Sequence, residues 1–151
     1  MRENPLGHTT TNSYNKLNLL TGTSDALGHT TGITYDADLN RATMIDGLVH
    51  TTSMVYDARD RLISKTDPAG GGTTTSTYDD ASNLLSVTDP VGNLTKDTYD
   101  ANNRRATMTL PTGGVTSYTY DLADNLVQTV DPLRNYPKTG SLSRCDSLRY
   151  Q

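Results

Sequence analysis

The sequence predicts an all-β fold: an antiparallel β-hairpin spiral of about six 21-residue repeats, forming an open segment of sheet. Three observations predict it. Tyrosines recur at a fixed spacing, turn-forming tetrapeptides recur in step with them, and threonine replaces much of the usual apolar content. No segment combines a helical period with helix caps, so we expect almost no helix.

The first recurring element is a tyrosine, and five of its six occurrences are followed directly by aspartate. Consecutive members differ in number by 21, 21, 22, 21 and 21. The series consists of Tyr14, Tyr35, Asp36, Tyr56, Asp57, Tyr78, Asp79, Tyr99, Asp100, Tyr120 and Asp121. A fixed period of ~20–50 residues is typical of proteins built from stacked structural repeats.

The second recurring element is a turn tetrapeptide, and its seven copies start at residues 4, 25, 46, 67, 89, 110 and 131. Aspartate first, proline second and glycine fourth are the preferences of a type I turn. An aspartate side chain can also accept hydrogen bonds from backbone N–H groups further along the turn. The copies closest to this pattern contain Asp67, Pro68 and Gly70, and Asp89, Pro90 and Gly92.

The residues between these two elements are predicted to form strands. A threonine stands four residues before each of the six repeat tyrosines, and at a period of 2 the two share a face of the sheet. Connections this short fit antiparallel neighbours, so we expect about twelve antiparallel strands. The one 22-residue spacing contains an extra residue in Gly70–Gly72, where we expect a bulge or a widened turn.

The composition requires a sheet without a thick apolar core. Hydrophobic residues make up 33% of the chain, and there is no Phe and no Trp. The 26 threonines suit a pleated, half-buried surface. We therefore expect hydrogen-bonded strands and cross-strand pairs to supply most of the order.

Charge and hydropathy exclude several classes. A net charge of −4 without a basic cluster argues against nucleic acid as a partner. No segment approaches the ~18 apolar residues of a membrane span, and the first residues contain no apolar signal-peptide region. The single Cys145 excludes an internal disulfide.

The repeat array is predicted to occupy residues 1–137 and to begin in the middle of a repeat. Residues 138–151 have neither recurring element and are net basic. Two hypotheses account for this tail: a divergent capping unit, or an abnormal end to a longer array.

No catalytic, cofactor-binding or metal-binding residue is predicted. His8, His29 and His50 are 21 residues apart, and an intervening strand would separate them by ~10 Å, too far to share one ion easily. The segment starting at Asp36 imitates a calcium loop but has Arg41 where glycine is needed. Cys145 has no nearby histidine to activate it.

The tyrosines support two hypotheses. Aromatic rows on a β-surface can stack on sugars, which would make the chain a carbohydrate-binding module. Alternatively, tyrosine supplies the covered face of a sheet that has no Phe or Trp, with its hydroxyl reaching water or the backbone. The second explanation is favoured.

The segment Tyr56–Gly70 contains Tyr-Asp-Ala-x-x-Arg-Leu followed by Thr-Asp-Pro-x-Gly, and it resembles the YD/RHS (rearrangement hotspot) repeat family. The resemblance covers roughly residues 4–137. In that family, long arrays form a hollow β-shell that encloses a toxin in bacterial polymorphic and insecticidal toxins, or a cell-surface barrel in teneurins. The chain lacks the core segment with self-cleaving aspartates, so self-processing and toxicity are not implied.

The resemblance implies a non-catalytic segment of an RHS-type shell, secreted or at the cell surface. Its expected partners are the remainder of the shell or an encapsulated toxin domain. By itself, an open ribbon exposes unpaired backbone groups on its first and last strands, so we expect edge-to-edge self-association. Few large apolar side chains offset the backbone ordering entropy of roughly 1–2 kcal/mol per residue, so marginal stability is expected.

Overall fold

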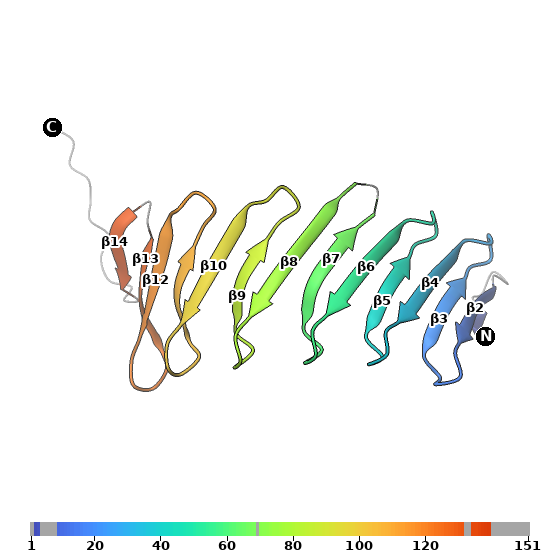
Figure 1. Cartoon of the computed structure of the whole chain (residues 1–151), viewed down its shortest axis with the longest axis horizontal. Coiled ribbons are helices and arrows are strands. Elements are labelled where there is room, and N and C mark those ends of the chain that lie inside the picture. Colours follow the sequence, from blue (N-terminus) through green and yellow to red (C-terminus); the bar gives the residue numbers. More distant parts are fainter. Residues whose placement is uncertain (1, 4–8, 69, 132–133, 140–151) are drawn as a thin grey trace. The chain divides into compact units, whose positions relative to one another are not determined.

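The computed structural model describes residues 2–3, 9–68, 70–131 and 134–139 (Figure 1). Within these ranges the chain consists of strands and turns and contains no helix. The all-β prediction is therefore confirmed. The described part of the chain has no helix that is long and apolar enough to cross a membrane.

The chain divides into two compact units, residues 1–77 with 87–93 and residues 78–86 with 94–151. Strands up to the division are β1 (Arg2–Glu3), β2 (Thr9–Tyr14), β3 (Leu20–Ser24), β4 (Thr30–Tyr35), β5 (Arg41–Ile45), β6 (Thr51–Tyr56) and β7 (Leu62–Asp67). Both units contribute to β8 (Gly72–Tyr78) and β9 (Leu84–Thr88). The second unit continues with β10 (Leu94–Tyr99), β11 (Arg105–Thr109), β12 (Val115–Tyr120), β13 (Leu126–Asp131) and β14 (Arg134–Thr139).

Every strand pair follows the order of the chain and is antiparallel. In the first unit the pairs run from β1–β2 to β7–β8, and in the second from β10–β11 to β13–β14. Because each strand pairs with its sequence neighbour, short turns suffice to connect them. The repeats supply the twelve strands β2–β13, as the spacing predicted, and β1 and β14 flank them.

The two faces of the sheet differ in how well side chains cover them. In β6, Thr52, Met54 and Tyr56 are half-buried on one face, whereas Val55 on the other is exposed. In β10, Tyr99 is again half-buried and Thr98 exposed. No hydrophobic side chain among the described residues is fully buried. The tyrosine face therefore takes the place of a core.

Threonine pairs link adjacent strands, as the composition predicted. A hydroxyl of one strand lies within hydrogen-bond distance of a hydroxyl on the next, which is a recurrent cross-strand interaction in antiparallel sheets. These pairs are Thr23–Thr31 (2.6 Å), Thr34–Thr43 (2.7 Å), Thr66–Thr73 (2.8 Å) and Thr98–Thr107 (2.7 Å).

The extra residue of the 22-residue spacing lies in a widened turn. The β7–β8 pairing is regular up to Asp67–Gly72, which leaves a four-residue connection, residues 68–71. Gly70 and Gly72 have φ of 78° and 75°, backbone angles that residues other than glycine rarely adopt. The turn, and not a bulge within the strands, accommodates the insertion.

At the other end, β14 extends the ladder beyond the predicted array boundary at residue 137. Its backbone pairs Lys138 with Thr129 and Thr139 with Gln128. The remainder of the predicted tail, residues 140–151, lies outside the described residues.

Candidate functional site: the tyrosine-aspartate turns

Apart from the widened turn after Asp67, the Tyr-Asp corners and the Asp-Pro-type turns have the same backbone geometry. After Tyr56, the Asp60 N–H donates to the Asp57 carbonyl (3.0 Å), and the Asp57 N–H donates to the Arg61 carbonyl (3.0 Å). On the opposite edge, Gly28 N–H donates to Asp25 (3.1 Å) and Asp25 N–H to the His29 carbonyl (3.0 Å). Both are three-residue hairpin loops in which a left-handed residue follows a type I turn.

In the three-residue turns that begin with aspartate or asparagine, this first residue caps the turn with a side-chain oxygen; the turn that begins at Leu110 has the same backbone bonds without such a cap. Asp57 Oδ1 accepts hydrogen bonds from the N–H groups of Arg59 (2.9 Å) and Arg61 (3.1 Å). Asn15, which replaces aspartate in the first turn, does the same for Leu17 and Leu19 (both 3.0 Å). The capping function is therefore performed by an acceptor oxygen, which aspartate and asparagine both supply.

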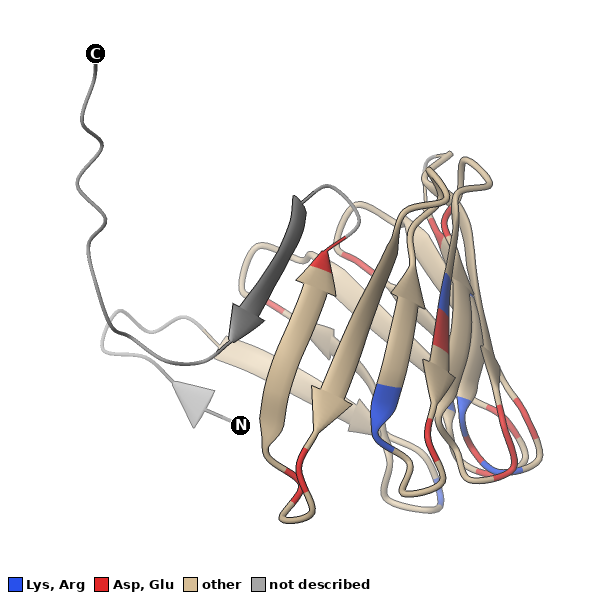
Figure 2. Ribbon diagram, turned by 90° about the vertical axis from the view of Figure 1, so that its left-hand side faces the viewer, with Lys and Arg blue, Asp and Glu red and all other residues tan. Residues whose placement is uncertain are grey.

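The second carboxylate oxygen binds the side chain of the fifth turn residue. Arg61 approaches Asp57 Oδ2 with Nε at 2.8 Å and Nη2 at 2.7 Å. These two contacts on one carboxylate oxygen, with the backbone N–H donors on the other, lower the pKa of Asp57 to about 2. A hydrogen bond from the Asn93 side chain similarly lowers the pKa of Asp89. Because aspartate caps these turns, most of the acidic residues lie in them (Figure 2).

The fourth turn residue has a left-handed backbone. On the Asp-Pro side this position is usually glycine, for example Gly28 and Gly92, with φ of 86° and 89°. On the Tyr-Asp side it is never glycine among the described turns. The residues other than glycine that have a positive φ in these Tyr-Asp turns are Asn18, Leu39, Asp60, Ser82, Asn103 and Asp124. Val49 is the corresponding residue in a turn on the Asp-Pro side. Several of the residues on the Tyr-Asp side are Asn or Asp, which tolerate this conformation best among residues other than glycine. An Asn or Asp three residues after the turn's first residue is therefore a sequence signal that could have revealed this turn type.

Successive Tyr-Asp turns are linked by side chains. The fifth residue of one turn contacts the fourth residue of the next. Asn40 Nδ2 donates to Asp60 Oδ1 (2.7 Å), and Asn83 Nδ2 donates to Asn103 Oδ1 (2.8 Å). Because these partners are 20 residues apart, sequence reasoning missed them.

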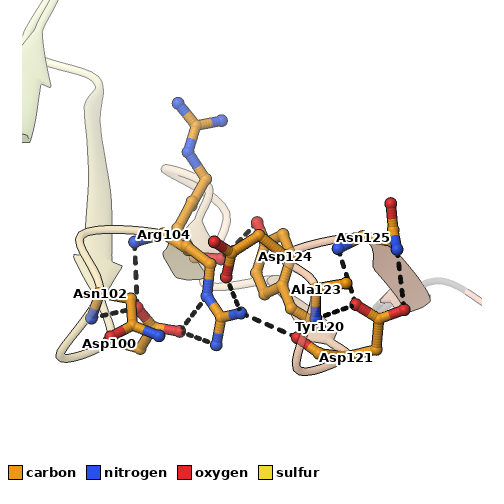
Figure 3. Close-up of polar contacts among 9 residues, drawn as sticks. Asp100, Asn102, Arg104, Tyr120, Asp121, Ala123, Asp124 and Asn125 are labelled. Carbon is orange, nitrogen blue, oxygen red and sulfur yellow. Dashed lines mark hydrogen bonds and ion pairs between the residues drawn. The ribbon is translucent and has the colours of Figure 1, made fainter.

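Arg104 makes several such links at once (Figure 3). Its Nε donates to Asp100 Oδ2 in its own turn (2.7 Å). Its Nη1 donates to Asp124 Oδ1 (2.6 Å) and to the Asp121 carbonyl (3.1 Å) in the next turn. The guanidinium also lies 4.7 Å from the centre of the Tyr120 ring, within the range of a cation–π contact. One side chain thus joins two repeats.

The tyrosine hydroxyls form a second link between repeats. Three of them donate to a backbone carbonyl fifteen residues earlier, on the second strand of the preceding repeat. These bonds are Tyr35 to Leu20 (2.8 Å), Tyr99 to Leu84 (3.0 Å) and Tyr120 to Arg105 (3.0 Å). Tyr56 departs from the pattern, since its hydroxyl contacts Met54 Sδ at 3.7 Å. Tyr14 is 55% exposed.

The other candidate residues take part in turns. His29 Nδ1 lies 2.8 Å from Asp25 Oδ2, and His50 Nδ1 lies 3.0 Å from Asp46 Oδ2. Asp36, which begins the calcium-loop imitation, caps its own turn. Within the described ranges, no three His, Cys, Asp or Glu side chains are grouped to hold a metal ion. His8 and Cys145 lie outside the described residues.

Two further features were not predicted. Asp97, on the tyrosine face, is 9% exposed and has Oδ2 3.2 Å from Arg105 Nη2, while its Oδ1 is buried without a partner among the described residues. The first unit also has a groove of about 470 Å³. Its lining includes Ile33, Met44, His50, Met54, Lys65 and Pro68 and contains no tyrosine.

Comparison with known proteins gives one family and a set of structural neighbours. The RHS repeat model matches residues 56–94 and 99–135, about half of the chain. No curated protein matches the sequence. A crystal structure titled TcdB2-TccC3-TEV has a TM-score of 0.65 at 15% identity, over 81% of this chain and 7% of that chain. A crystal structure of TcdB2-TccC3 without its hypervariable C-terminal region has a TM-score of 0.60 at 16% identity, over 85% and 7%.

Proposed function

This chain belongs to the RHS repeat family, and from that premise we propose that it is a non-catalytic wall segment of an RHS-type shell. The shell would be part of a toxin-delivery or cell-surface protein, secreted or exposed at the cell surface. The chain covers 7% of the length of the structural neighbours, so it corresponds to a small piece of such a wall.

The observation that carries this proposal is the use of the repeated polar groups. The Tyr99 and Tyr120 hydroxyls bind backbone carbonyls of the preceding repeat, and Arg104 binds the turn of the following one. These side chains are committed to joining repeats. Side chains that join one repeat to the next are typical of a continuous wall. The hydroxyls and the guanidinium used in this way are not free to take part in catalysis.

The proposed partners follow from the same role. A wall segment needs further repeats on either side, so we propose that its first partner is the remainder of an RHS shell. An enclosed toxin domain is the second. When the segment is alone, backbone N–H and C=O groups of its outermost strands can pair with another copy, which gives end-to-end self-association.

Carbohydrate binding through the tyrosines is the alternative. It requires ring faces and hydroxyls that are free to contact sugar. The hydroxyls of Tyr35, Tyr99 and Tyr120 instead donate to the backbone, which favours the structural role. The groove of the first unit also has no tyrosine in its lining.

A glycan array and an activity screen separate these functions. For a wall segment we expect no saturable glycan binding and no turnover of glycoside, peptide or phosphate ester substrates. Binding that disappears in the Tyr14→Ala variant, with Lys16→Ala as control, would instead support the carbohydrate hypothesis. Turnover retained through purification would overturn the wall proposal.

A further inference from the structure

The first unit displays a row of aliphatic side chains along one edge, which we call the tip row. It consists of the turn residues Leu27, Leu48, Val49 and Val91, which are 78%, 74%, 77% and 82% exposed. All four lie in the Asp-Pro-type turns, at the upper edge in Figure 1. None of them is covered by another part of the described chain.

The turn geometry does not require these residues. Leu27, Leu48 and Val91 occupy the third position of their turns, where the backbone accepts most residue types and polar ones are common. Val49 occupies the fourth position with φ of 66°. A β-branched residue is strained in this conformation, and equivalent positions in other turns have Gly28 and Gly92. Strain retained at an exposed apolar residue is typical of functional surfaces.

The charge of this edge also distinguishes it from the opposite one. In the turns of the first unit, the positions around Leu27, Leu48 and Val91 (26–28, 47–49 and 90–92) contain no charged residue. The Tyr-Asp turns of the same unit contain Lys16, Asp38, Arg59 and Asp60 at their tips. Two tip rows placed against each other would therefore meet through uncharged tip positions, with the carboxylates of Asp25, Asp46 and Asp89 at the base of the turns, whereas two Tyr-Asp edges would bring charged tip positions together.

We propose that the tip row is a contact surface for the tip row of a second copy of this chain, edge to edge. Its members lie in the turns that start at residues 25, 46 and 89, and the turn that starts at residue 67 contributes none. Successive turns are one repeat, or two strands, apart, which corresponds to about 10 Å along the edge. A surface that presents apolar groups at the same spacing is another array of the same repeat. Each contact is small, so the interface is weak and gains strength from the number of tips engaged together.

This contact differs from end-to-end pairing of outermost strands, because it involves turns and leaves the backbone ladders unchanged. It is also independent of the proposed wall function, which stands or falls on enzymatic and glycan-binding assays. A site-specific probe at the tip can therefore test it even if strand ends also associate.

The test uses disulfide cross-linking of the full chain with its native cysteine replaced, Cys145→Ser. One variant adds Leu48→Cys in the tip row. The matched control adds Leu17→Cys, which occupies the same third turn position in the same unit but on the Tyr-Asp edge and is 64% exposed. Under mild oxidation at equal concentration, we expect Leu48→Cys to form dimers at least about tenfold faster than Leu17→Cys, because docking raises the effective concentration of the thiols.

A further variant tests the apolar nature of the contact. Adding Leu27→Asp and Val91→Asp to the Leu48→Cys chain should lower its cross-linking to the rate of the control, while the far-ultraviolet circular dichroism retains its β spectrum. Equal rates for Leu48→Cys and Leu17→Cys would overturn the proposal. So would rapid cross-linking that persists in the doubly charged variant.

Discussion

The hydroxyl of Tyr99 donates a hydrogen bond to the backbone carbonyl of Leu84 at 3.0 Å. Leu84 begins the second strand of the preceding repeat, fifteen residues earlier. Tyr35 and Tyr120 repeat this relationship with their own predecessors. In these three repeats the tyrosine therefore has a structural role beyond covering one face, because its hydroxyl links its repeat to the preceding one.

Tyr99→Phe should lower the free energy of unfolding by about 1 kcal/mol, because it leaves the Leu84 carbonyl without this donor. Tyr56→Phe is the matched control, since the Tyr56 hydroxyl contacts only Met54 Sδ at 3.7 Å among the hydrogen bonds seen for it. Urea denaturation followed by circular dichroism measures both. A loss at Tyr56 as large as that at Tyr99 would contradict the role assigned to the carbonyl bond.

Val49→Gly should stabilise the chain by about 1 kcal/mol, because it relieves a β-branched residue at φ of 66°. The side chain is exposed, so little packing is lost with it. Thermal denaturation should show a higher Tm for Val49→Gly and a lower one for Gly28→Val, the reciprocal change in the preceding turn. An unchanged or lower Tm for Val49→Gly would show that the valine is not strained.

Acid should destabilise the fold through the turn aspartates. The folded pKa of Asp57 is lowered to about 2, so its contribution is present above the unfolded pKa near ~3.9 and is lost as the pH falls through the folded value. We expect the Tm to fall between about pH 4 and pH 2. Asp57→Asn should have a lower Tm at pH 7 and a shallower decline in acid, since asparagine caps the turn as Asn15 does but cannot pair with Arg61 as an ion.

Arg104→Lys should lower the Tm despite keeping the charge. An ammonium group cannot reproduce the bonds to Asp100, Asp121 and Asp124 together with the contact on the Tyr120 ring. Asp124→Ala should lower it less, because it removes one of these contacts. If the double variant loses only as much as Arg104→Lys, the two residues act through the same bond. If the decreases in Tm of the two single variants add up fully in the double variant, the two residues contribute to stability independently.

The isolated chain should be marginally stable. The described part contains no fully buried hydrophobic side chain, so little apolar burial opposes the ordering entropy. Sedimentation and thermal melting of the purified protein check this expectation. A sharp melt from a strictly monomeric species well above ~65 °C, the upper end of the common mesophile range, would contradict it.

The sequence alone determined the strands, the turns and the faces of the side chains in the strands that end at the repeat tyrosines. A period of 2 between Thr95 and Tyr99 places them on one face whatever else the chain does. Connections as short as Asp25–His29 permit only antiparallel neighbours. These features depend on residues close together in the chain, so the 21-residue spacing contained them.

The tertiary structure decided what the repeated side chains contact. Asp57 and Asp25 begin two turns of the same type. This likeness depends on the backbone angles of Asp60 and Gly28, which the residue type restricts but does not specify. That Arg104 reaches Asp124, and that Tyr99 reaches Leu84, depends on the stacking of successive repeats. Side-chain rotamers and strand register set these distances, because only they bring residues fifteen to twenty positions apart within hydrogen-bond range.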